Sequence, residues 1–125
     1  MPILMPQIEC APRDEIRALQ LDRLKHQVAY VYERVPWYRE QLDALGTKPE
    51  DIKTLDDVRR LPFTDKKVMR DTFPFGLFAI PVDDAVRLHS SSGTTGKPVV
   101  TGYNRHDMDV WSECIARLAQ MAGVT

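Results

Sequence analysis

The sequence predicts an α+β arrangement in which N-terminal helices precede a β-hairpin and one long final helix. Three observations predict it: apolar residues recur at helical spacing over 14–35 and over 105–122, two short apolar stretches flank a polar loop at 90–98, and hydrophobic residues make up 43% of the 125 residues. This length suits one small domain.

The helical part is predicted to extend over about residues 1–81. Apolar residues at steps near three and four mark a long amphipathic helix over 14–35; they are Ile16, Leu19, Leu24, Val28, Val31 and Val35. Pro36 ends this helix and opens a second one over Trp37–Leu45, with Gly46 beyond its end.

Two shorter helices are expected next. Thr54 and Asp57 resemble a capping box for a helix that stops before Pro62, and Thr64 is expected to cap another over Asp65–Asp71. The stretch 73–81 is apolar, aromatic and broken by proline and glycine. It is either a loop whose phenylalanines fill a core or the wall of an aromatic substrate pocket, and the sequence leaves both open.

The hairpin and the final helix are predicted over about residues 85–123. Arg87–His89 and Val99–Tyr103 are expected as strands, and Asn104 as the cap of a helix over Arg105–Ala122. This helix has one apolar stripe, yet no strand follows for it to cover, and a two-stranded hairpin is marginal by itself. We therefore expect the chain to be the front part of a larger protein, and to self-associate through the hairpin edges and the Trp111 face.

The loop between the two strands is the main candidate site. It reads Ser90-Ser91-Ser92-Gly93-Thr94-Thr95-Gly96-Lys97-Pro98. Hydroxyls, backbone N–H groups made accessible by glycine and one lysine charge suit a polyphosphate. The loop does not match the P-loop of the NTPases, because Ser91 stands where that motif has its first glycine and Pro98 follows the lysine. A flexible linker is the alternative.

Composition excludes several other classes of protein. A formal charge of −1 argues against nucleic acid or an anionic membrane as the partner, and no apolar run is long enough to span a bilayer. The first residues lack the features of a signal peptide. Cys10 and Cys114 lie far apart and are expected to be reduced thiols in a cytoplasmic protein. The three histidines have no ligand spacing, so no metal site is predicted.

The loop resembles the phosphate-binding motif of the adenylate-forming superfamily. The order Ser91-Ser92-Gly93-Thr94-Thr95-Gly96-Lys97-Pro98 is similar to that of the phenylacetate-CoA ligase branch. Three further stretches resemble this family, and together they extend the resemblance over nearly the whole chain: Ile8–Glu15, Val35–Arg39 and Leu61–Phe78.

The resemblance implies a two-step ligase. ATP and an arylacetate give an acyl-adenylate and pyrophosphate, and coenzyme A then displaces AMP to form a thioester. By position, eight residues would hold the β- and γ-phosphates of ATP, and any Mg²⁺ would arrive with ATP; the residues are Ser90, Ser91, Ser92, Gly93, Thr94, Thr95, Gly96 and Lys97.

Members of this family are several times longer than 125 residues. The resemblance therefore implies that residues 1–125 are an α+β part of the large N-terminal α/β domain. No catalytic residue is expected within them, and the piece alone is expected to be inactive. The alternative is a non-catalytic nucleotide-binding or protein-interaction module.

Overall fold

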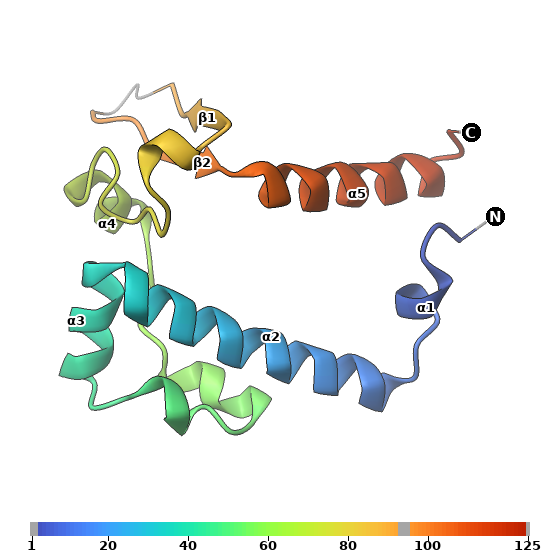
Figure 1. Ribbon diagram of the computed structural model, residues 1–125, viewed down its shortest axis with the longest axis horizontal. Helices are drawn as coiled ribbons and strands as arrows, with labels where there is room; N and C mark the ends of the chain where they lie inside the picture. The colour runs from blue at the N-terminus through green and yellow to red at the C-terminus, as the bar shows by residue number, and fades with distance from the viewer. Residues whose placement is uncertain (1–2, 93–95, 125) are drawn as a thin grey trace.

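The computed structural model describes residues 3–92 and 96–124 and confirms the predicted α+β arrangement. Figure 1 shows two long helices, α2 (Arg13–Arg34) and α5 (Arg105–Met121), on opposite sides of the molecule. A short helix that was not predicted, α1 (Pro6–Glu9), lies beside their ends. The other elements are α3 (Pro36–Ala44), the 3-10 helices η1 (Pro49–Asp51), η2 (Leu55–Arg60) and η3 (Val82–Asp84), α4 (Lys66–Asp71), and the strands β1 (Arg87–Ser90) and β2 (Val100–Tyr103).

Helix α2 begins and ends one residue earlier than predicted. Val35 is extended, because proline disfavours helical geometry at the residue before it. Pro36 is then the first residue of α3, as predicted, and α3 ends at Ala44. Gly46 has φ +61°, a left-handed conformation that favours glycine and reverses the chain after the helix. No helix of the described part is long and apolar enough to cross a membrane.

The hydrophobic core lies where α3, η1 and η2 pack against α2. Val28, Leu42 and Ile52 are each at most 3% exposed and form its centre, and Leu24, Tyr32 and Leu61 pack around them. Val35 is the fourth buried apolar side chain of the described residues. The core is therefore small and sits on one side of α2.

A polar cluster on the surface joins α2, α3 and the start of η1. The Tyr32 hydroxyl donates to Asp43 Oδ1 at 2.8 Å, and Lys48 Nζ donates both to the same carboxylate and to the Tyr32 hydroxyl. The hydrogen bonds that Lys48 and Tyr32 donate to Asp43 hold the pKa of Asp43 below its ordinary value of 3.8, and the bond from Lys48 has the larger effect. The bond to Asp43 likewise raises the pKa of Lys48.

One of the two caps predicted for the shorter helices is correct, and the other is wrong by one residue. The Asp57 carboxylate accepts from the Thr54 N–H at 2.7 Å, as the predicted capping pair requires, although the helix is a 3-10 helix. The prediction for α4 was wrong by one residue: Asp65 is the cap and accepts from the Val68 N–H at 2.9 Å. Thr64 instead hydrogen-bonds the Tyr38 hydroxyl at 2.8 Å.

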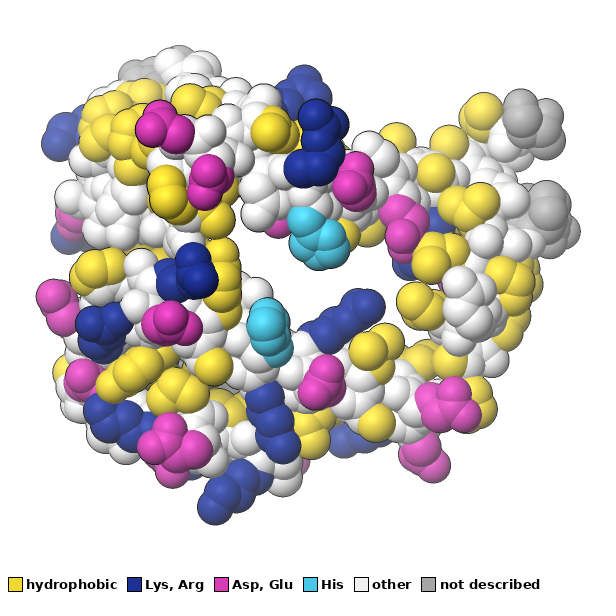
Figure 2. All heavy atoms as spheres, in the orientation of Figure 1, with side chains coloured by type: hydrophobic (Ala, Val, Ile, Leu, Met, Phe, Trp, Pro, Cys, Tyr) yellow, Lys and Arg dark blue, Asp and Glu magenta, His cyan; other side chains and the backbone are white. Residues whose placement is uncertain are grey.

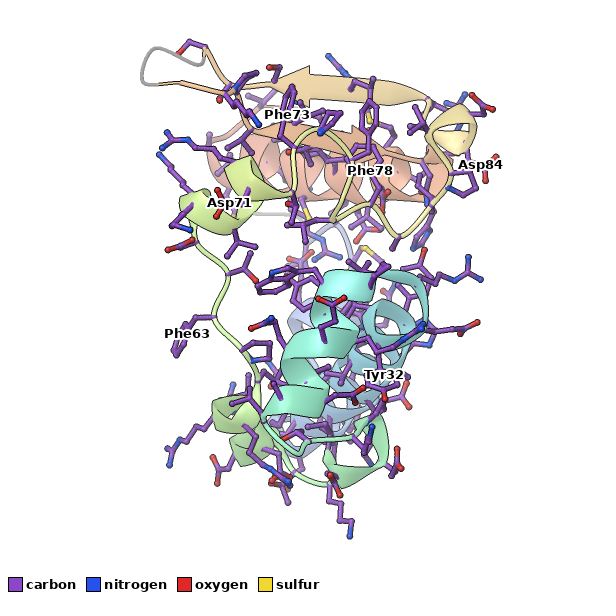
Figure 3. The ribbon with its side chains drawn as sticks, turned by 90° about the vertical axis from the view of Figure 1, so that its left-hand side faces the viewer. Tyr32, Phe63, Asp71, Phe73, Phe78 and Asp84 are labelled. Atoms are coloured by element: carbon purple, nitrogen blue, oxygen red, sulfur yellow. The ribbon has the colours of Figure 1, made fainter. Side chains whose placement is uncertain are left out.

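The irregular segment 73–80 packs beneath the hairpin. A Cβ atom on Gly102 would lie 2.4 Å from the Phe78 ring, so a larger residue there would require this ring to move. Figure 3 shows Phe73 and Phe78 near the hairpin, whereas Phe63 points away and is 95% exposed. The Tyr30 hydroxyl donates to the Ala79 carbonyl at 3.3 Å, which links this segment to α2.

The hairpin is antiparallel and leads directly into α5. Its register pairs Arg87 with Tyr103 and Ser90 with Val100. Asn104 and Asp107 form the predicted cap, with each backbone N–H bonded to the other's side chain at 2.9 and 2.8 Å. The Trp111 ring stacks on Tyr103 with centroids 5.4 Å apart, so α5 is fixed to the strand that precedes it.

At its far end, α5 is joined to the N-terminal segment. Arg117 forms an ion pair with Glu9 at 3.6 Å and another with Glu113. Arg117 thus connects α1 to α5 on the side away from the hairpin.

Truncation of Leu42 should destabilise the fold strongly. Leu42→Ala removes a side chain that is 1% exposed and leaves a cavity in a small core, so the free energy of unfolding should fall by about 2–5 kcal/mol in urea titrations followed by circular dichroism. Leu45→Ala, at a position that is 56% exposed, is the control and should change it by less than about 0.5 kcal/mol. Equal effects of the two variants would contradict this core assignment.

The polar cluster should make stability depend on pH. Because folding lowers the pKa of Asp43, its contribution is complete above its ordinary pKa of 3.8 and is lost as the pH falls through the lower folded value. Urea midpoints of the unmodified chain should therefore exceed those of Asp43→Asn at pH 6, and the two should converge near pH 2. Asp56→Asn, at an exposed carboxylate, is the control; a gap to Asp43→Asn that persists in acid would exclude this linkage.

Candidate functional site

The polar loop is closed at its base by Ser91 and Val99. The Ser91 N–H donates to the Val99 carbonyl at 3.0 Å, and the Val99 N–H donates to Ser91 Oγ at 2.9 Å. The serine side chain thus takes the place of a backbone carbonyl in the last step of the ladder. It accepts one hydrogen bond here and keeps its own hydroxyl hydrogen for another partner.

The described residues of the loop lie on the surface. Ser90, Ser91, Ser92, Gly96 and Lys97 are exposed. The Ser90 hydroxyl donates to the Ser91 carbonyl at 3.1 Å, which leaves Ser92 as the loop serine with no hydrogen-bond partner among the described residues. The predicted ligands Gly93, Thr94 and Thr95 lie outside the described residues.

Gly96 and Lys97 differ in what constrains them. Gly96 has φ +129°, where glycine is strongly favoured, and a Cβ atom there would meet nothing within 4 Å. Glycine is therefore favoured at position 96 by the backbone conformation, and not by a lack of space for a side chain. The Lys97 ammonium lies 5.8 Å from the centre of the Phe73 ring, so a cation–π contact links the loop to the segment below it.

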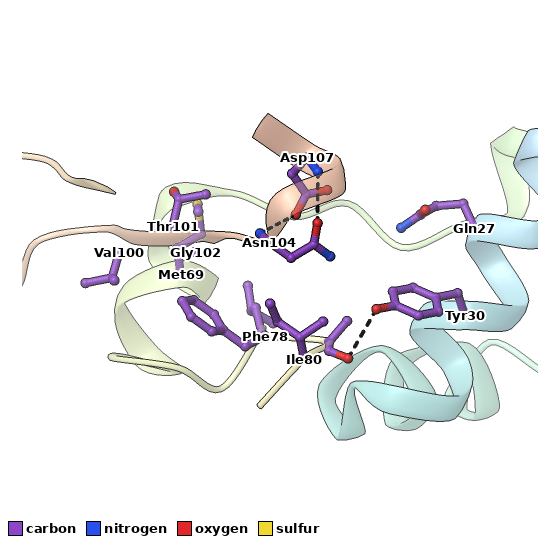
Figure 4. A pocket seen from close by; sticks show the side chains of 12 residues that line it. Gln27, Tyr30, Met69, Phe78, Ile80, Val100, Thr101, Gly102, Asn104 and Asp107 are labelled. Carbon is purple, nitrogen blue, oxygen red and sulfur yellow. Dashed lines mark hydrogen bonds between the residues drawn. The ribbon is translucent and has the colours of Figure 1, made fainter. Parts of the chain in front are cut away.

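A cavity of about 300 Å³ lies beneath strand β2. Figure 4 shows Phe78 and Ile80 on one side of it and Val100, Thr101 and Gly102 on the other. Tyr30 and Gln27 of α2, Met69 of α4 and the Asn104–Asp107 cap also line it. The segment 73–81 thus both packs against the hairpin and lines a cavity.

The three histidines occupy different surroundings. The His89 ring packs edge-on against both Tyr103 and Trp111, with centroids 5.2 and 5.3 Å away, and so contributes to the contact between hairpin and helix. His26 and His106 are exposed and line a hollow of about 690 Å³ between α2 and α5, visible in Figure 2. Within residues 3–92 and 96–124, no group of three or more His, Cys, Asp or Glu is placed to hold a metal ion.

Two features of the site were missed by the sequence analysis. One is the role of Ser91 in closing the loop, and the other is the contact between Lys97 and Phe73. The first depends on the strand register, which sets Ser91 opposite Val99 and which only the structure supplies. No local signal pointed to the second.

Comparison with known proteins identifies the relatives of this chain. A phenylacetate-coenzyme A ligase of Thermus thermophilus is 52% identical over 118 residues, covering 94% of this chain and 26% of that protein. The ligase of the same name from Escherichia coli K12 is 48% identical over 116 residues, covering 93% and 26%. This chain is a relative of the phenylacetate-coenzyme A ligases. It spans about a quarter of the length of these curated relatives, and no protein-family model matches it.

Solved structures place this relative of the ligases in the adenylate-forming fold. A 2-hydroxyisobutyryl-CoA ligase in complex with 2-HIB-AMP and CoA, in the thioesterification state, superposes with a TM-score of 0.82 at 30% identity and covers 90% of this chain and 25% of that structure. The same ligase in the postadenylation state gives a TM-score of 0.75 at 28% identity.

Loss of the Ser91 hydroxyl should open the base of the loop. Ser91→Ala leaves the Val99 N–H without its partner, so amide exchange at Val99 should accelerate at least about tenfold, as expected for a lost hydrogen bond of about 1.4 kcal/mol. Ser92→Ala removes a neighbouring hydroxyl and is the matched control. Unchanged exchange at Val99 in Ser91→Ala would show that the side chain does not close the loop.

Proposed function

We propose that this chain is the phosphate-binding portion of an ATP-dependent phenylacetate-CoA ligase. In the whole protein, ATP and an aryl acid form an acyl-adenylate and pyrophosphate, and coenzyme A then displaces AMP to give the thioester. The observation that carries this proposal is an exposed, glycine-containing hydroxyl loop on a closed hairpin, in a chain 52% identical to a ligase of this name.

The loop residues divide by the chemistry they offer to a triphosphate. The Ser91 and Ser92 hydroxyls and the backbone N–H groups of Ser92–Lys97 supply donors for the β- and γ-phosphate oxygens. Gly93 and Gly96 let the backbone turn toward the phosphates, Thr94 and Thr95 add two hydroxyls, and Lys97 adds a positive charge. Such contacts hold the triphosphate while a carboxylate attacks the α-phosphate in line.

The proposal assigns no catalytic residue to residues 1–125, which we take as the N-terminal part of the large ligase domain. The aryl acid and coenzyme A are substrates of the whole protein, and Mg²⁺ enters with ATP. By itself, this chain should therefore be inactive. Its two cysteines are free and exposed, which suits a cytoplasmic protein, and an unpaired hairpin edge favours self-association of the isolated chain.

The proposal is tested in the ligase that contains this chain at its N-terminus. Thioester formation is measured with ATP, coenzyme A and a panel of aryl and alkyl acids. The proposal expects an arylacetate to give the highest kcat/KM; absence of any ATP-dependent thioester formation would exclude the ligase function and favour a non-catalytic module.

Two loop variants test the assignment of the phosphate contacts. Ser92→Ala and Lys97→Ala each remove a group offered to a charged ligand, so kcat/KM for ATP should fall about 10- to 100-fold, equivalent to roughly 1.5–3 kcal/mol. Lys66→Ala, at an exposed lysine of α4, is the charge-matched control. Loop variants that behave like Lys66→Ala would mean that the phosphates bind elsewhere.

A further inference from the structure

We propose that Phe73 is a positioning residue for the polar loop, whose ring holds the Lys97 ammonium beside the loop so that it can bind the phosphates of ATP. This inference rests on the proposed function, because Lys97 can act on ATP only if the loop binds ATP. It gives Phe73 a part in ATP binding, whereas the sequence left a core residue and the wall of an aromatic pocket as its alternatives.

The contact joins the loop to the segment that follows α4. Lys97 Nζ lies 5.8 Å from the centre of the Phe73 ring, within the distance of about 6 Å over which an aromatic face attracts a cation. Among the residues that the structure describes, Lys97 forms no ion pair, and Asp71, the acidic residue nearest to Phe73 in the sequence, is paired with Lys67. Within the described chain, the ring is therefore the group that holds this charge.

The backbone fixes the place of the Phe73 ring. Phe73 follows α4 after one residue, and its N–H donates to the Arg70 carbonyl at 3.3 Å. The turn beyond it is closed by a hydrogen bond from the Gly76 N–H to the Thr72 carbonyl at 2.8 Å. A Cβ atom on Gly76 would lie 2.6 Å from the Thr72 carbonyl oxygen, so a side chain there would force this turn to open. The ring is thus carried by a tight turn at the end of α4 (Figure 3).

The same turn packs against the hairpin that carries the loop. The Phe75 ring lies on the Phe78 ring with centroids 5.1 Å apart, and Phe78 lies against Gly102 of β2. Lys97 stands shortly before β2 in the sequence. Ring and lysine are therefore both held close to β2, and their separation depends on packing within this part of the chain.

An uncharged ring can hold a lysine without neutralising it. A carboxylate in this place would pair with the ammonium and repel the phosphates that approach it. The face of an aromatic ring attracts the cation through its quadrupole and leaves the positive charge available. A phosphate of the ligand can therefore bind the ammonium without displacing a competing anion.

Restraint of Lys97 also lowers the entropic cost of binding. Lysine has a flexible four-carbon side chain with many rotamers, and an unrestrained lysine loses this freedom when it binds a phosphate. Contact with the ring removes part of the freedom before the ligand arrives, so less is lost on binding. Phe73 should thus strengthen the binding of ATP and have little effect on the chemical step.

The experiment compares Phe73 variants in the ligase that contains this chain at its N-terminus. Phe73→Leu keeps an apolar side chain without a ring, so it should raise KM for ATP about two- to fivefold and change kcat by less than about twofold, as expected for the loss of one cation–π contact. Phe73→Tyr and Phe73→Trp keep a ring face and should keep KM near that of the unmodified ligase.

Phe75→Leu is the matched control in the same turn. Phe75 and Phe73 are equally exposed, at 38% and 37%, but the Phe75 ring packs on Phe78 and has no cation over it. Phe75→Leu should therefore leave KM for ATP unchanged. Circular dichroism checks that each variant folds, and Phe73→Met replaces Phe73→Leu if that variant unfolds.

Two further measurements show whether Phe73 acts through Lys97. In a Lys97→Ala background, Phe73→Leu should have no further effect on KM for ATP, because the ring then has no cation to hold. In the ligase labelled with ¹³C-lysine, the ε-methylene signals of Lys97, assigned by their loss in Lys97→Ala, should be shifted upfield by the ring. They should return toward the position of exposed lysines in Phe73→Leu.

Four results would overturn this inference and leave the proposed function standing. They are equal KM values for ATP in Phe73→Leu and Phe75→Leu, an equal effect of Phe73→Leu with and without Lys97, Lys97 signals that do not move in Phe73→Leu, and a rise in KM for the aryl acid in place of ATP, which would assign Phe73 to the acid pocket. Absence of ATP-dependent thioester formation by the unmodified ligase would instead exclude the proposed function, and this inference with it.

Discussion

The pairing of β1 with β2 is the interaction on which the candidate site depends. It ends at the double hydrogen bond between Ser91 and Val99, which closes the base of the polar loop. Two short strands are marginal alone, so the pair needs support from both sides. Phe78 provides it beneath Gly102, and the stack of Tyr103 on Trp111 provides it at the start of α5. The polar loop is thus held on a packed base.

Local signals predicted much of the secondary structure. Such signals specify a helix start or end from within a few residues of it. Examples are the Asn104–Asp107 cap, the glycine after α3 and the proline at the start of α3. The loop could be placed between two strands for the same reason, because apolar stretches flank it directly. The error at α4 shows the limit of such signals. Thr64 and Asp65 are both good caps, and a hydrogen bond between Thr64 and Tyr38, 26 residues away, engages Thr64.

Contacts between distant segments could not be predicted. The apolar spacing on α5 showed that the helix has a face to bury but not that His89 and Tyr103 of the hairpin pack against its Trp111. Likewise, neither the ion pair of Arg117 with Glu9 nor the position of Lys97 over Phe73 has a counterpart in local spacing. These contacts depend on how the elements are arranged in space. In the candidate site, the residue types were predictable, whereas the use of Ser91 to close the loop required the structure.

The central claim is that the loop above the Ser91–Val99 closure binds polyphosphate. A pyrophosphate titration of the ¹⁵N-labelled chain, followed by amide chemical shifts, tests this claim most directly. The account predicts that the largest shifts occur at residues 90–97 and at Val99, saturate with one ligand per chain, and diminish in Lys97→Ala. Shifts centred on Lys66 and Lys67 of α4, with the loop amides unmoved at saturation, would contradict it.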